Sequence, residues 1–249
     1  MKIVFKNCTL LDGTRDMCAK KGVDISVENG KIVGIGEIKP DSGDEVIDLT
    51  GKYLMPGLIN LHVHLPAGGK PQKKPLKADM LSKLALSSAF IREFTLRMCH
   101  SYAMQGLMSG VTTIRTVGGL ADIDTKLRDR INSGKLDGPR ILASDFAIGV
   151  PHGHMVGSVA RAAETPEQAV KMVDELKGLN ADLVKLMITG GVMDAKVKGE
   201  PGELKMPPEL IRACCDEAHR LGFKVAAHVE SPVGMTAALE NGVDFSHER

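Results

Sequence analysis

Four histidines lie where apolar segments of the sequence end. His62 and His64 are two residues apart in NLHVHL, while His228 and His247 close the segments FKVAAH and VDFSH. Side chains at positions i and i+2 of a strand point to the same side, so His62 and His64 could bind one metal ion. Each histidine alone could instead be a core residue that hydrogen-bonds a neighbouring carbonyl. Four at the same point of a repeated pattern favour a metal site.

Lys185 is the second unusual residue, because it lies inside DLVKLMI, an otherwise apolar segment that predicts a buried strand. A free ammonium group is costly to bury. One interpretation is a salt bridge to a carboxylate of the same fold. The other is an amine whose pKa is lowered by burial, so that it can react with carbon dioxide to form a carbamate.

The segments that would position these residues alternate between strand and helix from about residue 55 onward. Strand and helix that repeat at roughly thirty-residue spacing predict an α/β fold of the TIM type, a (β/α)8 barrel whose reacting groups sit at the carboxyl ends of the strands. About six strands can be placed, so the barrel is expected to be incomplete. The expected strands are residues 54–64, 111–117, 139–148, 182–188, 223–229 and 243–247.

Short signals predict where several elements begin. Thr165-Pro166 with Gln168 forms a capping box, and Ser231-Pro232 starts a later helix. Asn29-Gly30 predicts a two-residue turn between antiparallel strands. We therefore expect residues 1–54 to form an incomplete β-sandwich portion and residues 55–249 to form the metal-binding barrel, strands one to six.

The composition argues against several function classes. Lys plus Arg total 32 against 31 for Asp plus Glu, without a basic cluster among aromatic residues, so no nucleic-acid partner is expected. No apolar run approaches the ~18 residues that cross a bilayer, which predicts no membrane contact and a cytoplasmic protein.

The five cysteines lack C-x-x-C spacing and are expected to be free thiols. Residues 65–77, rich in lysine and proline, are expected to form an exposed loop that could cover a substrate.

The ordered set of motifs resembles the amidohydrolase superfamily, and within it the subgroup with imidazolonepropionase-like and prolidase-like enzymes. YLMPGLINLHVH resembles the first-strand motif of that family, and GVTTIRTVGG resembles the second. PHGHMVG, ADLVKLMITGG, VAAHVES and VDFSH follow in the family's order. The resemblance covers essentially the whole chain.

The resemblance implies a site for two divalent metal ions, with zinc as the expected metal. It implies that His62 and His64 bind one ion, that His228 and His247 bind the other, and that a carboxylated Lys185 bridges them. A hydroxide shared by the two ions would then be the nucleophile. The sequence has no G-x-S-x-G motif that would supply a serine nucleophile instead.

Three residues are expected to bind the substrate. The resemblance implies that His152 and His154, in the loop after the third strand, contact a substrate carbonyl or carboxylate; the alternative is a polar loop with incidental histidines. Arg115 could grip a carboxylate through its guanidinium. The chain departs from the family here, because Val150-Pro151 replaces two glycines and Thr116 stands where an aspartate is usual.

We expect a metal-dependent hydrolase of carbon–nitrogen (amide) bonds, acting on a small molecule such as a dipeptide, an N-acyl amino acid or a cyclic amide. The full-length protein is expected to be a homo-oligomer. One alternative is a non-catalytic metal-binding or interaction protein derived from such a barrel. A second is a decarboxylase or deaminase that uses the same site, since a fold does not determine the reaction.

No catalytic residue can be assigned, because the general-base aspartate of the family follows an eighth strand and this sequence ends two residues after His247. We expect the sequence to be a fragment, or a truncated product, of a longer hydrolase. Purified residues 1–249 should therefore turn over small amides poorly, since a general base typically contributes a factor of about 10² to 10⁴ in rate. Steady-state assays with dipeptides and N-acyl amino acids test this, and efficient turnover would overturn it.

Overall fold

The structure, a computed structural model, describes residues 2–69, 78–192, 195 and 201–247. It divides into two compact units, Met1–Gly57 and Leu58–Arg249, and the boundary expected after residue 54 lies beside this division. Residues 70–77 of the loop expected to cover a substrate lie outside the described residues. Within the described part, no helix combines the length and apolar character needed to cross a bilayer.

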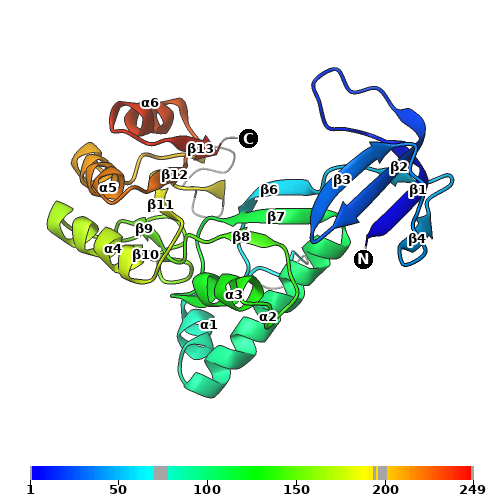
Figure 1. Ribbon diagram of the computed structural model, residues 1–249. Helices are drawn as coiled ribbons and strands as arrows, with labels where there is room; N and C mark the ends of the chain where they lie inside the picture. The colour runs from blue at the N-terminus through cyan, green and yellow to red at the C-terminus, as the bar shows by residue number, and fades with distance from the viewer. Residues whose placement is uncertain (1, 70–77, 193–194, 196–200, 248–249) are drawn as a thin grey trace. The chain divides into compact units, whose positions relative to one another are not determined.

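The first unit is a five-stranded sheet in the order β3-β2-β1-β4, with β5 paired to β1 (Figure 1). Asn29 and Gly30 join two antiparallel strands and have φ angles of 50° and 72°, so the expected tight turn is confirmed. The strands are β1 (Ile3–Leu10), β2 (Lys20–Glu28), β3 (Lys31–Gly36), β4 (Glu45–Asp48) and β5 (Tyr53–Leu54).

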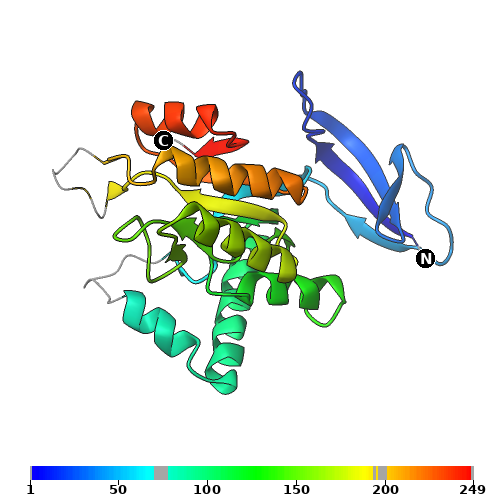
Figure 2. The ribbon, with the colours of Figure 1, turned by 90° about the vertical axis from the view of Figure 1, so that its left-hand side faces the viewer.

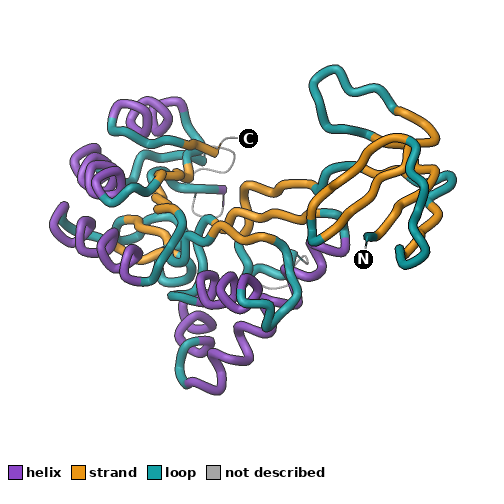
Figure 3. Tube along the Cα trace, in the orientation of Figure 1, coloured by secondary structure: helices purple, strands orange, loops and turns teal. Residues whose placement is uncertain are grey.

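The second unit contains both strands and helices along its length (Figure 3). Its strands pair in parallel. They form two sheets, β6-β7-β8 and β10-β9-β11-β12-β13. The strands are β6 (Leu58–Val63), β7 (Val111–Thr116), β8 (Arg140–Leu142), β9 (Ala147–Gly149), β10 (Ala160–Ala162), β11 (Leu183–Met187), β12 (Lys224–His228) and β13 (Phe245–His247). The helices are α1 (Ala78–Ala85), α2 (Ala89–Met108), α3 (Ile123–Asn132), α4 (Pro166–Gly178), α5 (Pro208–Arg220) and α6 (Pro232–Glu240).

The helix starts expected from the sequence are confirmed at α4 and α6. The hydroxyl oxygen of Thr165 accepts from the Gln168 N–H, and that of Ser231 accepts from the Gly234 N–H. At α4 the Gln168 side chain accepts from the Glu164 N–H, one residue before the position that a standard capping box uses.

All five cysteines are free thiols, as expected. α4 and α5 lie side by side along the outside of the unit (Figure 2).

The third expected strand, residues 139–148, is not continuous. It consists of β8 and β9, and the four residues between them carry the chain from one sheet to the other. Asp145 in this segment has a φ of 52°, a left-handed conformation that interrupts a strand. The segment Ala143–Phe146 is therefore where the wall of the incomplete barrel divides.

The two faces of β11 differ in what they contact. Val184, Leu186 and Ile188 belong to the apolar core that also contains residues of α4 and α5. Leu183 clusters instead with Val117 and Ala226 from neighbouring strands. Since side chains alternate along a strand, Lys185 shares the face of Leu183, away from the helices. This alternation places the one cation of the strand inside the barrel wall.

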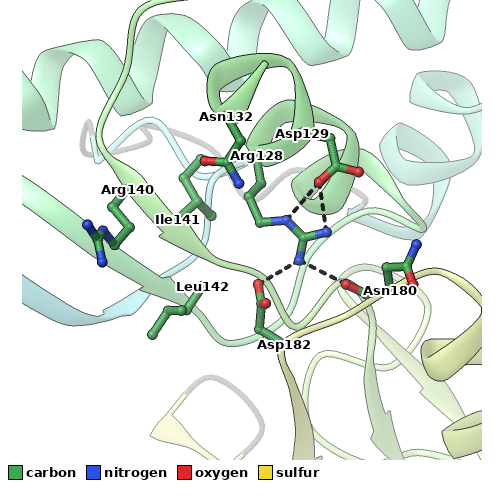
Figure 4. A pocket seen from close by; sticks show the side chains of 8 residues that line it. All are labelled: Arg128, Asp129, Asn132, Arg140, Ile141, Leu142, Asn180 and Asp182. Carbon is green, nitrogen blue, oxygen red and sulfur yellow. Dashed lines mark hydrogen bonds and ion pairs between the residues drawn. The ribbon is translucent and has the colours of Figure 1, made fainter. Parts of the chain in front are cut away.

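An ion pair joins α3 to Asp182, the residue before β11 (Figure 4). Arg128 of α3 donates to Oδ2 of Asp182 (2.6 Å) and to the Asn180 carbonyl oxygen (2.8 Å). The same Oδ2 accepts from the Ala143 N–H at 2.7 Å, and the Asp182 N–H donates to the Ala143 carbonyl at 2.7 Å. These groups line a polar pocket whose Arg128 is already held by Asp182 and Asp129. In barrels of this type, the amino ends of the strands serve stability, so we interpret the pocket as structural.

Replacement of Asp182 by Ala should lower the free energy of unfolding by about 2 kcal/mol, because Arg128 loses one of its acceptors and the Ala143 N–H loses its acceptor. Urea unfolding followed by circular dichroism measures the change. The matched control is Asp129→Ala, which removes the second carboxylate that pairs with Arg128. Because the Asp129 side chain is 58% exposed, this variant should lower the free energy of unfolding by less than about 1 kcal/mol. Equal losses in the two variants would contradict a bridging role for Asp182.

Candidate metal centre

His62 and His64 turn their rings toward each other at the carboxyl end of β6. Their Nε2 atoms are 3.2 Å apart, and the ring planes meet at 69°. This proximity agrees with the i, i+2 argument that placed both rings on one side of the strand. Two imidazole nitrogens this close together could approach a single cation.

A backbone carbonyl fixes the orientation of the His64 ring. Nδ1 of His64 lies 2.9 Å from the carbonyl oxygen of Gly118, which can only accept, so this contact assigns the proton to Nδ1 and leaves Nε2 with its lone pair. Burial lowers the pKa of His64, and the nearby charges of Lys185 and His154 lower it further, against the opposing effect of the Gly118 hydrogen bond. A neutral imidazole is the form that binds metals.

Lys185 is fully buried, and its Nζ has no hydrogen-bond partner among the described residues. Burial lowers the pKa of this amine to about 7, with a smaller contribution from the positive charge of Arg115. No salt bridge involving Lys185 occurs within the described ranges, which disfavours the first of the two sequence-based interpretations. A buried, partly neutral amine beside histidines is instead suited to chemical modification.

His228 lies in register with the other strands of its sheet. Its Cα pairs with that of Met187 on β11 and with that of His247 on β13. The His228 ring stacks on His154, with centroids 4.2 Å apart and an interplanar angle of 12°. For His247 the structure supports only this backbone register.

The three residues expected to bind substrate occupy different environments. His154 lies against the His228 ring, and a Cβ on Gly191 would come within 2.5 Å of its Cε1, so the loop packs closely around it. His152 is exposed, and within the described segments no contact joins it to the other site residues. Arg115 is 7% exposed, donates from Nε to the Leu61 carbonyl at 2.9 Å, and lies over the Phe245 ring. Its role toward a substrate stays a prediction.

Glu230 is a further residue at this end of the strands, one that was not singled out from the sequence. Its Oε1 is 3.6 Å from Nε2 of His228, and its side chain is 21% exposed. The Glu230 N–H donates to the Thr189 hydroxyl, which holds the backbone in place. The i, i+2 rule that pairs His62 with His64 would also have paired Glu230 with His228.

The donor atoms present fit divalent metal ions in type. The imidazole nitrogens of His62 and His64 face each other, and the charge of the buried Lys185 amine is close enough to affect His64. Among the described residues, however, no group of three or more His, Cys, Asp or Glu side chains lies close enough to form a metal site by itself. Lys185 is not among those residue types, and its Nζ would become a ligand only after modification.

Comparison with known proteins places these residues in context. The sequence profile described as the amidohydrolase family matches residues 53–249. A candidate prolidase from Bifidobacterium longum is 33% identical, with a TM-score of 0.76 over 98% of this chain and 53% of its own. An Xaa-Pro dipeptidase with methionine bound in its active site is 28% identical, with a TM-score of 0.81 over 99% of this chain and 61% of its own.

A 5-methylthioadenosine/S-adenosylhomocysteine deaminase from Thermococcus onnurineus is 25% identical over 194 residues, which are 74% of this chain and 41% of the deaminase. This chain therefore spans between two fifths and three fifths of the lengths of these three proteins. The similarity to solved structures nevertheless extends over nearly all of its residues.

Two buried carboxyl groups lie behind the Gly118–Gly119 turn that holds His64. Asp124 is fully buried, and neither carboxyl oxygen has a well-oriented hydrogen-bond partner in the part of the chain that the structure describes. Burial raises the pKa of Asp124 to about 7, the Asp145 charge adds to the effect, and nearby Thr116 opposes it. Burial also raises the pKa of Asp145 to about 6, although Thr125 donates to that carboxylate from both its N–H and its hydroxyl.

The raised pKa of Asp124 predicts a stability that falls as pH rises. The folded state holds the Asp124 proton up to about pH 7, whereas the unfolded state releases it near its ordinary value of 3.8. The folded state therefore loses stability between about pH 4 and pH 7, by up to ~4 kcal/mol at ~1.4 kcal/mol per pKa unit. Asp124→Asn, which stays neutral, should gain stability relative to the parent over that range.

Unfolding free energies measured from pH 4 to pH 8 test this expectation. The control is Asp129→Asn on the same helix, whose side chain is 58% exposed, and its difference from the parent should stay nearly constant. An Asp124→Asn difference that does not grow with pH would mean that Asp124 is ionised throughout in the folded protein.

Proposed function

Because the chain belongs to the amidohydrolase family, we propose that it carries most of the metal site of a hydrolase that cleaves carbon–nitrogen bonds. In this proposal His62 and His64 hold one divalent ion, His228 and His247 hold a second, and Lys185, as its carbamate, lies between them. The proposal also assigns residues 55–249 to strands one to six of the barrel that presents these groups, and residues 1–54 to an incomplete β-sandwich portion.

The observation that carries the proposal is the complete burial of the Lys185 amine. A fully buried amine without a hydrogen-bond partner among the described residues is costly, and its lowered pKa leaves a fraction of it neutral at physiological pH. The neutral amine can attack carbon dioxide; the new N–C bond forms as one C=O bond opens, and the amine proton leaves to solvent. The resulting anion would supply oxygen ligands where the side chain has only a nitrogen.

The surroundings of His64, His154 and Arg115 support a role for each in this proposal. Two divalent ions bound here would lower the pKa of a shared water and polarise an amide carbonyl. The Gly118 carbonyl keeps Nε2 of His64 directed at the site. His154, stacked on the His228 ring, would contact a substrate carbonyl oxygen in this proposal. Arg115, close enough to affect the Lys185 pKa, would be a favourable neighbour of a carbamate anion.

A dipeptide is the substrate class that we favour. The two solved structures described above as a candidate prolidase and an Xaa-Pro dipeptidase match nearly the whole chain. A cyclic amide has weaker support, because a dihydroorotase from Bacillus pumilus is 39% identical over only 77 residues, or 31% of this chain. An N-acyl amino acid would present the same amide and carboxylate groups as a dipeptide.

Metal binding tests the proposal directly. The purified chain should bind zinc, and His64→Asn should weaken binding by at least about tenfold, because one of the two facing imidazoles is lost. Competition with a chromophoric chelator measures the affinity, and mass spectrometry of the parent detects a carbon dioxide adduct on Lys185. His100→Asn is the matched control, since His100 bonds the Asp137 carbonyl away from the site.

The Lys185→Ala variant should affect the binding of the two ions differently. In a form of the protein that contains all strands of the barrel, this variant should lose the second ion before the first, and short carboxylates in the buffer should restore part of the binding. Lys185→Glu should retain some binding. Two ions held by the alanine variant as tightly as by the parent, together with an unmodified parent lysine, would contradict the proposed bridge.

A further inference from the structure

The Gly118–Gly119 turn is held from behind by the segment between β8 and β9. The Gly118 N–H donates to the Ser144 hydroxyl at 2.8 Å, and the Gly119 N–H donates to the Asp145 carbonyl at 2.6 Å. Ser144 in turn donates its hydroxyl proton to the Asp145 carbonyl at 3.2 Å. Both residues are completely buried. The turn is thus fixed by hydrogen bonds from a segment that does not itself reach the metal site.

The backbone conformation and the close neighbours of the Gly118–Gly119 turn leave it little room to move. Gly118 has a φ of 121°, which residues with a side chain rarely adopt, and a Cβ there would lie 3.4 Å from the His64 ring and from Val159. On the other side, a Cβ on Gly119 would lie 2.7 Å from Cγ of Asp124. The turn is therefore enclosed between the His64 ring and the Asp124 carboxyl group.

We propose that Ser144 is a positioning residue for His64: it holds the Gly118 N–H, so that the carbonyl of Gly118 stays at Nδ1 of His64 and Nε2 remains the metal-binding nitrogen. Ser144 acts only through the backbone of Gly118 and touches neither substrate nor metal. The inference rests on the proposed function for its consequence in metal binding, while its effect on the imidazole can be measured without metal.

Removal of the hydroxyl should loosen this arrangement in a definite way. In Ser144→Ala the buried N–H of the Val117–Gly118 peptide group loses its acceptor. If this peptide group turns to regain one, the φ and ψ angles of Gly118 change, and the adjoining Gly118–Gly119 peptide group carries its carbonyl away from Nδ1. The His64 proton would then distribute between the two nitrogens. Loss of an outer partner of a metal-binding histidine typically costs about 10- to 100-fold in metal affinity.

The experiment uses the whole chain labelled with ¹⁵N-histidine. Long-range ¹H–¹⁵N correlation spectra without metal should show His64 of the parent protonated at Nδ1 and that of Ser144→Ala with a substantial Nε2–H population. Zinc affinity of Ser144→Ala should fall by about tenfold or more. Ser144→Cys, whose sulfur accepts weakly, should lie between the two and provides a graded test if the alanine variant folds poorly.

Thr95→Val is the matched control. Thr95 is buried on α2, and its hydroxyl donates to the Ala85 and Ile91 carbonyls, so its loss removes a buried hydroxyl without touching the Gly118 turn. This variant should keep the parent tautomer and zinc affinity.

The outcomes separate the two proposals. Variants of Ser144 that keep both the Nδ1–H tautomer and a zinc affinity within about twofold of the parent would overturn the positioning role. A parent that binds no zinc, but whose His64 tautomer still changes in Ser144→Ala, would overturn the proposed function and leave the positioning role supported.

Discussion

The hydrogen bonds of the segment Ala143–Asp145 hold the second unit together. Its polar groups bond to parts of the unit that are far apart in the sequence. The Ala143 N–H and carbonyl both bond Asp182, at the start of the five-stranded sheet. Ser144 bonds Gly118 beside the three-stranded sheet, and the Asp145 carboxylate bonds Thr125 of α3. The four residues between β8 and β9 therefore connect two sheets, a helix and the turn that orients His64. These contacts explain why the left-handed conformation of Asp145 is tolerated there.

Burial of Lys185 adds a second constraint. The strand that contains it gives its alternate residues to the helix-facing core, so its register cannot slip by one residue without exposing that core. Among the residues that the structure describes, the Lys185 amine is thus kept inside by the packing of its neighbours and not by a hydrogen-bond partner. Within these residues no ion pair of Lys185 would have to break before the amine reacts.

Much of this arrangement could be predicted from the sequence. The Asn29-Gly30 turn and the helix starts at Thr165 and Ser231 depend on local chemistry, which the sequence contains in full. Proximity of His62 to His64 follows from strand alternation alone. The family itself was also anticipated, because several motifs occur in a defined order.

The division of the third strand could not be predicted, since the left-handed Asp145 depends on Thr125, which is twenty residues away in sequence. The surroundings of Arg115 were equally inaccessible: its bond to the Leu61 carbonyl reflects the pairing of two strands 54 positions apart. His247 was placed at the end of a strand, and the register with His228 agrees, but its role as a ligand stays a prediction. Long-range contacts decide these cases, and a periodic pattern contains no information about them.

The Arg128–Asp182 pair lies at the amino end of β11, whereas His228 ends the neighbouring strand β12 and His64 directly follows β6. In the proposed function, the contacts that stabilise the sheets and the groups that would bind metal therefore lie at opposite ends of the barrel wall. The loop bearing His152 and His154 is not among the groups that contact Asp182 in the described part of the chain. A separation of this kind would let related proteins change their substrate specificity in the course of evolution while they keep the contacts that stabilise the fold.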